Sequence, residues 1–300
     1  MSSGLTQQGR SVPLFSRTPG LNIVAPGEQL QDDPEKSPLS MAYNVDLTSV
    51  GGVCRRYGYT LLSELTDPHS LWADGEACFV VAQAVLYKVN KDLTIQSVRD
   101  DITTGLPMYY AKVGRRVYYE NGLDCGLWPD GEWDLRIPTG APPDAVYSFP
   151  TLGKYLTAYN GRLYCAVDDF LHFTEYMNLH ATRLNRNVAQ MPTRINFIAA
   201  SEDVLWVGTE ESIVALTGGG PADFKFSTVC DYPAMDDTVA KVPAARYKPG
   251  TWWFCNTSHG MCALGPNGAF ENMTQNTVAV PGTAGCGAVF PSGKYVVTFD

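Results

Sequence analysis

Short apolar, aromatic-rich runs alternate with polar turns along most of the 300-residue chain. Six such turn-and-run units, from ADGEACFVVA to FPSGKYVVTF, can be aligned at one residue of each turn, and these anchors recur at intervals of 39 to 47 residues. The anchors are Gly75, Gly114, Gly161, Asp203, Gly250 and Gly293. A repeat of this length is typical of the four-stranded blades of a β-propeller.

The order of the pieces within each unit also repeats. A strand-like run such as YYAKV or INFIAA precedes the turn, and the turn leads into the aromatic run, which indicates a hairpin. A third short run and a looser fourth piece, such as WDLRI or FKFSTVC, follow in most units. We therefore predict an all-β fold, a six-bladed β-propeller of four-stranded blades beginning near residues 68, 106, 153, 193, 238 and 280. The alternative is a β-sandwich, or two stacked β domains, with coincidental spacing.

The sixth unit, TAGCGAVFPSGKYVVTFD, contains only its first hairpin. An open edge strand invites aggregation, so this blade needs further strands. The one unassigned strand-like segment is NVDLTSVGGVCRRYGYTLLSEL, residues 44–65, which has the length and apolar content to supply them. We expect strands from both ends of the chain to close the last blade. The residues expected in these ring-closing strands are Arg55, Arg56, Tyr57, Tyr295 and Val297.

Two segments fall outside the repeat. Residues 1–43 are rich in Pro, Gly, Ser and Gln, which predicts an extended N-terminal arm. The segment YMNLHATRLNRNVAQMPTR, residues 176–194, carries Arg183, Arg186 and Arg194 and has no acidic residue. It is interpreted either as a solvated loop or as an insertion that contacts an acidic partner or DNA.

Composition and charge narrow the classes of function. With 45% hydrophobic and 18% charged residues, the chain has an ordinary globular composition. Its net charge of −9 argues against tight binding of nucleic-acid phosphates; an acidic surface serves solubility, or lets DNA slide past. We expect no secretory signal and no membrane span, because no apolar stretch is long enough. Eight cysteines without a C-x-x-C pair suggest reduced thiols of a protein made in a cytoplasm, with disulfides as the alternative.

The residues needed for catalysis are not arranged in a recognisable site. The four histidines lack the spacing of metal ligands, and no G-x-S-x-G nucleophile elbow occurs. The only compact acidic cluster beside an aromatic strand is Asp168, Asp169 and Glu175, which is interpreted as a group of strand-end turn residues. The sequence therefore predicts no enzyme, no cofactor and no metal.

Two stretches carry a resemblance to a known family. MAYNVDLTSVGGVCRRYGYTLL resembles the N-terminal signature of the tail hub or nozzle proteins of short-tailed bacteriophages, also called tail tubular protein B or packaged-DNA-stabilising proteins. The matching positions are Asn44, Gly51, Gly52, Arg55, Arg56 and Gly58. SIVALTGGGPADFKFSTV, residues 212–229, looks like the middle of the propeller of these proteins. Such nozzles are often much longer, with platform and tip domains.

The resemblance implies a structural protein of the virion tail, made in the host cytoplasm. Copies of the chain, expected to form a hexameric ring, would lie below the head–tail adaptor, extend the DNA channel, retain packaged DNA and anchor tail fibres or a needle. DNA would pass through the lumen without sequence-specific binding.

The main alternative is a propeller that binds a host glycan or protein, as a receptor-binding or baseplate component. Tryptophans could stack on sugars, although those within predicted strands are expected to pack between blades. The six are Trp72, Trp128, Trp133, Trp206, Trp252 and Trp253. A third possibility, a propeller hydrolase, requires a pair of carboxylates facing the channel.

Overall fold

The computed structural model describes residues 45–47, 53–55, 61, 64–274, 277, 278, 280 and 282–299. The chain divides into two units, one comprising residues 1–60 and 274–279 and the other residues 61–273 and 280–300. In the first unit, β1 (Val45–Leu47) pairs antiparallel with β2 (Val53–Arg55). The other described strands all belong to the second unit.

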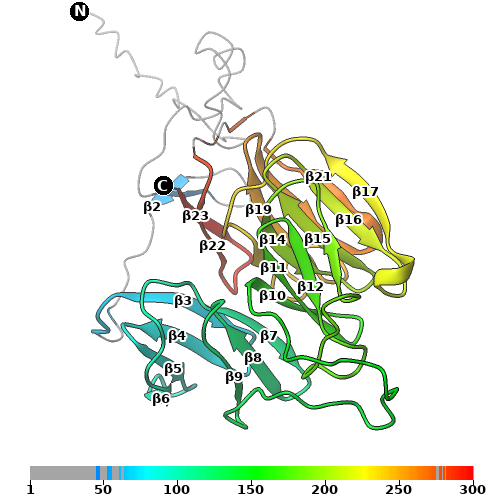
Figure 1. Cartoon of the computed structure of the whole chain (residues 1–300). Helices are drawn as coiled ribbons and strands as arrows, with labels where there is room; N and C mark the ends of the chain where they lie inside the picture. Colours follow the sequence, from blue (N-terminus) through cyan, green and yellow to red (C-terminus); the bar gives the residue numbers. More distant parts are fainter. Residues whose placement is uncertain are drawn as a thin grey trace, which may run out of the picture. The chain divides into compact units, whose positions relative to one another are not determined.

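The second unit is a succession of antiparallel sheets in which strands pair in chain order (Figure 1). The first two sheets contain β3 (Pro68–Ala73), β4 (Cys78–Ala82), β5 (Val85–Val89) and β6 (Ile95–Arg99), then β7 (Tyr109–Val113), β8 (Arg116–Glu120) and β9 (Cys125–Trp128). The next two contain β10 (Lys154–Tyr159), β11 (Arg162–Val167), β12 (Phe170–Phe173) and β13 (Val188–Gln190), then β14 (Ile195–Ala200), β15 (Val204–Thr209), β16 (Ile213–Thr217) and β17 (Lys225–Cys230).

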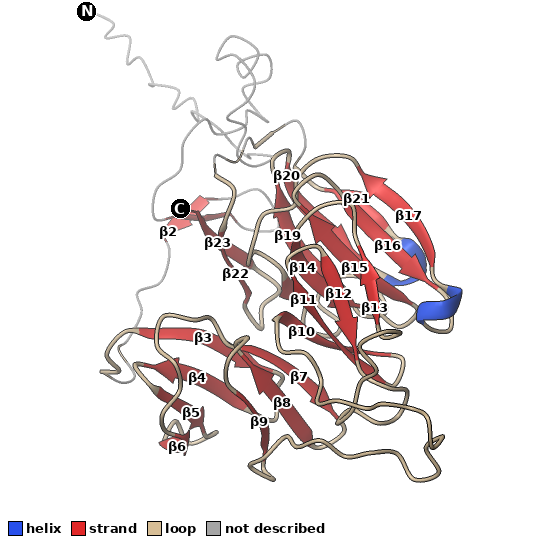
Figure 2. Ribbon diagram, in the orientation of Figure 1, coloured by secondary structure: helices blue, strands red, loops and turns tan. Residues whose placement is uncertain are grey.

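The fifth sheet contains β18 (Ala240–Lys241), β19 (Trp253–Thr257), β20 (Gly260–Leu264) and β21 (Phe270–Asn272). A hairpin of β22 (Gly285–Val289) and β23 (Tyr295–Phe299) follows it. Two short 3-10 turns, η2 (Pro221–Asp223) and η3 (Pro266–Gly268), are the helical segments among the described residues (Figure 2). No helix in the described part of the chain has the length and apolar character to cross a membrane.

Local turn chemistry explains why neighbouring strands pair. The β10–β11 turn is Asn160–Gly161, and both residues have positive φ (44° and 72°). This Asn-Gly pair favours the two-residue hairpin turn whose twist matches that of the strands. Each hairpin therefore forms from contiguous sequence, and only the stacking of the sheets needs distant contacts.

The core lies at the seams between successive sheets. In β15, all six residues are buried, because alternate side chains face the two neighbouring sheets. Leu205 and Val207 join Tyr164 in one apolar cluster, whereas Trp206 joins Cys255 in the next. The first strands of the sheets also meet: β10 contacts β7 and β14, and β18 contacts β22. This arrangement of sheets confirms the expected all-β, β-propeller fold.

The second sheet differs from the expected four strands, because WDLRI does not join it. Trp133 is buried, but Leu135 and Ile137 are exposed. The backbone here pairs with a loop of the third sheet instead: the Arg136 N–H donates to the His180 carbonyl (3.3 Å). Residues 132–137 therefore belong to the connection between the second and third sheets. The run WDLRI, which the repeat predicts as a strand, is part of a loop with exposed apolar side chains.

The expected closure by both ends of the chain stays a prediction. Among the described residues, β1–β2 and β22–β23 are separate two-stranded sheets, and the number of six blades also remains a prediction. Arg55 is the last residue of β2, whereas Arg56, Tyr57 and the N-terminal arm lie outside the described residues. Tyr295 and Val297 lie in β23, opposite Val289 and Gly287 of β22.

Candidate functional site

Two adjacent carboxylates meet two tyrosines where the first strands of the sheets converge. Asp236 and Asp237 belong to the connection between the fourth and fifth sheets. The Tyr109 hydroxyl of β7 donates to the Asp237 Oδ1 (3.1 Å), and the Tyr155 hydroxyl of β10 donates to the Asp236 Oδ1. The two tyrosine rings contact edge to face, with centroids 5.1 Å apart. We call these four residues the central clasp.

The backbone of the clasp holds the C-terminal hairpin. The N–H groups of Gly285 and Gly287 donate to the carbonyl oxygens of Asp236 and Asp237, at 3.1 and 3.2 Å. A Cβ on Gly287 would lie only 2.1 Å from the Thr238 carbonyl oxygen, so this close approach requires glycine. The aspartates thus bind β7 and β10 through their side chains and β22 through their backbone.

The clasp is electrostatically unusual. Burial, reinforced by the neighbouring Asp236 carboxylate, raises the pKa of Asp237 to about 6, although the Tyr109 hydrogen bond and Lys154 oppose the shift. Burial and the same carboxylates raise the pKa of both tyrosines well above the ordinary range. Because each carboxylate already accepts a hydroxyl donor, the arrangement suits a structural tie better than acid–base catalysis.

The predicted arginines do not form one basic surface. Arg183 pairs with both carboxylate oxygens of Glu175, Nε to Oε1 at 2.6 Å and Nη2 to Oε2 at 3.2 Å. Arg194 instead lies beside the clasp, with Nη2 3.5 Å from the Asp236 Oδ2. Arg186 is exposed. Two of the three arginines in segment 176–194 therefore form ion pairs with acidic residues of the same chain.

The acidic cluster noticed in the sequence has structural roles. Although burial opposes it, the hydrogen bonds from Arg183 and Asn187 hold the pKa of Glu175 below its usual range. Asp169 accepts a hydrogen bond from the Gln190 side chain (2.7 Å), and Asp168 has a positive φ of 54° in the β11–β12 turn. No group of three or more His, Cys, Asp or Glu within the described ranges is arranged to hold a metal ion.

Sequence reasoning missed a fully buried carboxyl group, Glu120, at the end of β8. Its Oε2 accepts the Gly153 N–H (3.3 Å), and its Oε1 has no partner among the described residues. Burial raises the pKa of Glu120 well above its usual range, and it does the same for the nearby Cys165 thiol. Glu120 is therefore a protonated, uncharged side chain that is packed between the second sheet and the start of the third.

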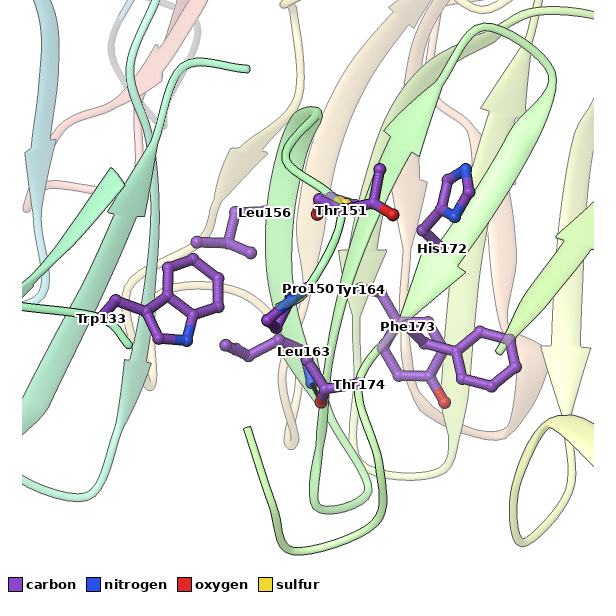
Figure 3. A pocket seen from close by; sticks show the side chains of 10 residues that line it. Trp133, Pro150, Thr151, Leu156, Leu163, Tyr164, His172, Phe173 and Thr174 are labelled. Carbon is purple, nitrogen blue, oxygen red and sulfur yellow. Dashed lines mark hydrogen bonds between the residues drawn. The ribbon is translucent and has the colours of Figure 1, made fainter. Parts of the chain in front are cut away.

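The pocket beside the third sheet is too small for a ligand. Figure 3 shows Trp133 and Leu156 on one side of it and His172 and Phe173 on the other. Its volume of about 10 Å³ matches a single water molecule. The His172 Nδ1 lacks a partner among the described residues and could be satisfied by such a water.

Two long connections form the most distinctive surface. Residues 129–153 and 174–187, which we call the loop pair, are joined by reciprocal backbone bonds between Ser148 and Thr182 (3.0 Å each). The Asn178 side-chain amide also donates to the Arg136 carbonyl (2.8 Å). Large apolar side chains are nevertheless exposed along both loops. They are Leu135, Ile137, Val146, Tyr176, Met177 and Leu184.

All six tryptophans contact other groups of the protein, either backbone carbonyls or aromatic rings. Four of them donate their indole N–H to backbone carbonyls, at 2.9 to 3.3 Å: Trp133, Trp206, Trp252 and Trp253. Trp72 stacks on Tyr110 at 5.6 Å, and Trp128 contacts Phe79 edge to face at 5.6 Å. A ring that stacks on a sugar needs an open face, which this packing limits.

These features define a β-propeller whose central polar groups bind one another and whose apolar side chains are displayed on a pair of bonded loops. No protein-family model and no curated protein matches the chain. Among solved structures, it is similar to the extracellular domain of a protein assigned as a hybrid two component system from B. thetaiotaomicron, at 12% identity and a TM-score of 0.45. That match covers 79% of this chain and only 31% of the other.

Two similar structures are enzymes by their descriptions. Streptogramin B lyase is 12% identical, with a TM-score of 0.43, over 80% of this chain and 85% of that one. A gluconolactonase from Xanthomonas campestris is 13% identical, with a TM-score of 0.44, over 79% of this chain and 85% of that one. At TM-scores below 0.5, these likenesses provide no basis for assigning a function.

Proposed function

We propose that this chain is a non-enzymatic β-propeller module that binds a protein partner through its loop pair. The observation that carries the proposal is the concentration of six large exposed apolar side chains on two loops that are hydrogen-bonded to each other. Large apolar side chains exposed close together mark an interaction site more often than apolar residues scattered singly over a surface do.

The construction of the loop pair supports binding. Val146 is 82% exposed, yet its neighbour Tyr147 is covered by the Arg183 guanidinium, 5.5 Å from the ring centroid. The backbone under the surface is thus held before a partner arrives, which lowers the entropy cost of association. Tyr176, Met177 and the exposed Arg136 are of the residue types enriched at protein interfaces. Because the tryptophans are packed, a protein partner fits better than a glycan.

A photo-crosslinking amino acid at position 146, in the organism that encodes the chain, should give one dominant adduct. The same amino acid at Phe226, which is 55% exposed in the outer strand β17, is the matched control and should give none. Adding Met177→Asp and Leu184→Asp should abolish the adduct at 146, because burying either carboxylate in an interface is costly.

The mass of the adduct identifies the partner as a second copy or another protein. Similar labelling from positions 146 and 226, or an adduct that survives both aspartate substitutions, would show that the loop pair is not the binding surface.

The second candidate is a ring subunit of a short-tailed bacteriophage tail nozzle, which the sequence resemblance favours. The stretch 212–229 that carries part of it corresponds to β16, η2 and β17. The loop pair would then contact another copy in the ring, the adaptor or a tail fibre. The bond between Tyr109 and Asp237 ties β7 to the connection between the fourth and fifth sheets. In this proposal, DNA would therefore pass between copies rather than through one propeller.

Quantitative mass spectrometry of purified particles tests this candidate. A fixed copy number that is a simple fraction of the portal protein's number is expected for a tail ring component. Absence of the chain from the particles removes the virion proposal, and the general binding module remains to be tested by crosslinking.

A further inference from the structure

A groove of about 260 Å³ lies between the β7–β8 turn and the β10–β11 turn. The residues that line it are Lys112, Val113, Gly114, Ala158, Tyr159, Asn160, Gly161, Arg162 and Leu179. Two of these side chains are cationic and none is acidic. On a chain with a net charge of −9, a recess lined by two cations and by no acidic side chain is unusual.

The two cations differ in how their charge is used. Lys112 is neutralised by the Asp74 carboxylate, at 2.6 Å, and by Glu76. Arg162 forms no ion pair within 4 Å among the described residues, although the Glu175 carboxylate, which is bonded to Arg183, lies near enough to interact with it electrostatically. The Arg162 Nη1 donates to the Thr174 carbonyl (2.6 Å), which leaves other N–H donors of the guanidinium for a ligand.

Aromatic rings hold the Arg162 side chain in place. The guanidinium carbon lies 5.6 Å from the Phe173 ring centroid and 5.9 Å from that of Tyr176. A planar guanidinium held by two cation–π contacts and by one hydrogen bond is preorganised to accept a carboxylate through two parallel N–H···O bonds. The groove therefore presents one oriented arginine rather than a diffuse positive field.

The groove is continuous with the loop pair. The Met177 N–H donates to the Gly161 carbonyl (2.8 Å). A Cβ on Gly161 would lie 2.9 Å from Tyr176 Cε2 and 3.1 Å from Met177 Sδ, so both side chains pack over this turn. Leu179 of the same loop lines the groove itself. A bound segment can thus contact Arg162 and the exposed apolar side chains together.

We propose that the groove binds an acidic peptide segment, with an Asp or Glu side chain of the partner on Arg162 and a neighbouring apolar side chain on Tyr176 and Met177. The proposal rests on the proposed function, because it requires a protein partner. Charge complementarity selects the carboxylate, and the continuity of the two surfaces selects an apolar residue close to it in the sequence.

Selection of a phage-displayed random 12-residue peptide library on the full chain tests the proposal. Enriched peptides should share an Asp or Glu at a constant distance from Leu, Ile, Phe or Met. By calorimetry, Arg162→Met should weaken binding of the best peptide by about tenfold to a hundredfold, the range expected when a charge-assisted hydrogen bond is lost. Arg115→Met, an exposed arginine of the neighbouring turn, should change it less than about twofold.

A second measurement avoids any effect of the substitution on folding. Replacing the peptide's acid by its amide should cost as much as Arg162→Met, and the two changes together should cost no more than either alone, because both remove the same contact. Additive losses would overturn the pairing.

Other outcomes also decide the matter. No enrichment, or enriched peptides without an acid, overturns the acidic-peptide inference. If apolar peptides bind through Met177 independently of Arg162, the proposed function stands and this inference fails. If acidic peptides need Arg162 while crosslinking from position 146 gives no specific adduct, the groove inference stands, and the part of the loop pair around Val146 is not the binding surface.

Discussion

Deletion of residues 291–300 is expected to abolish cooperative folding. The deletion removes β23, so every residue of β22 loses the partner with which it is paired in the hairpin. It also removes Tyr295, whose hydroxyl donates to the Thr238 carbonyl (2.6 Å) and accepts from the Asn256 side chain (3.2 Å). The tyrosine ring packs edge to face on Phe254, with centroids 5.8 Å apart, so the deletion also opens the apolar cluster of the fifth sheet.

The expected loss exceeds about 5 kcal/mol in the free energy of unfolding, as large as the whole stability of many domains. Urea titration followed by tryptophan fluorescence and by far-ultraviolet circular dichroism measures it. Tyr295→Phe is the matched control: it retains the ring, and the loss of its hydrogen bonds should cost about 1–2 kcal/mol within a single transition. A deletion variant with the midpoint and slope of the full chain would show that the hairpin is dispensable.

Asp237→Asn is expected to stabilise the protein above pH 6. The folded-state pKa of Asp237 is about 6, raised above the reference value of 3.8, so folding favours the protonated acid. Its contribution to stability is fully present below about pH 4 and is lost as the pH rises through 6. At pH 8 the ionised carboxylate therefore destabilises the fold by about 2–3 kcal/mol.

An asparagine carries no charge at any pH, and its side-chain oxygen can still accept the Tyr109 hydroxyl. The variant should gain about 2 kcal/mol at pH 8 and almost nothing at pH 4. Urea titrations at pH 4, 6 and 8 measure this difference, with Asp231→Asn, an exposed residue of the same connection, as the control. A gain that does not change with pH, or one equal to that of the control, would contradict the assigned role of Asp237.

Local sequence was a good guide to the strands, because each hairpin forms from adjacent residues. VLWVGT, which is β15, is apolar enough to be buried on both faces, and the Asn160–Gly161 turn specifies its own hairpin. Local sequence wrongly predicted that WDLRI is the fourth strand of the second sheet. Hydrophobicity indicates that a segment is buried, but it does not indicate the segment against which it packs. Trp133 packs against the loop that contains Leu179, whereas Leu135 and Ile137 are exposed.

The candidate sites depend on contacts between side chains that cannot be predicted from the spacing of residues along the sequence. The basic character of segment 176–194 was visible in the sequence, but the pairing of Arg183 with Glu175 was not, because it requires the loop to fold back. Nothing in the sequence distinguishes Arg162 from Arg115 or Arg116, which also follow a turn glycine. Its separate role comes from the rings of Phe173 and Tyr176, which hold it at the edge of the groove.

The sequence by itself determined the β-strand repeat and the order of its hairpins, because alternation of side chains and turn geometry act over a few residues. Only the tertiary structure decided which polar groups meet. Tyr109 and Asp237 are 128 positions apart, and they bond because stacking of the sheets brings β7 beside the connection between the fourth and fifth sheets. The raised pKa of Asp237 also depends on the assembled fold, because its largest cause is burial of the carboxyl group, whereas the carboxylate that reinforces the shift, Asp236, is its neighbour in the sequence.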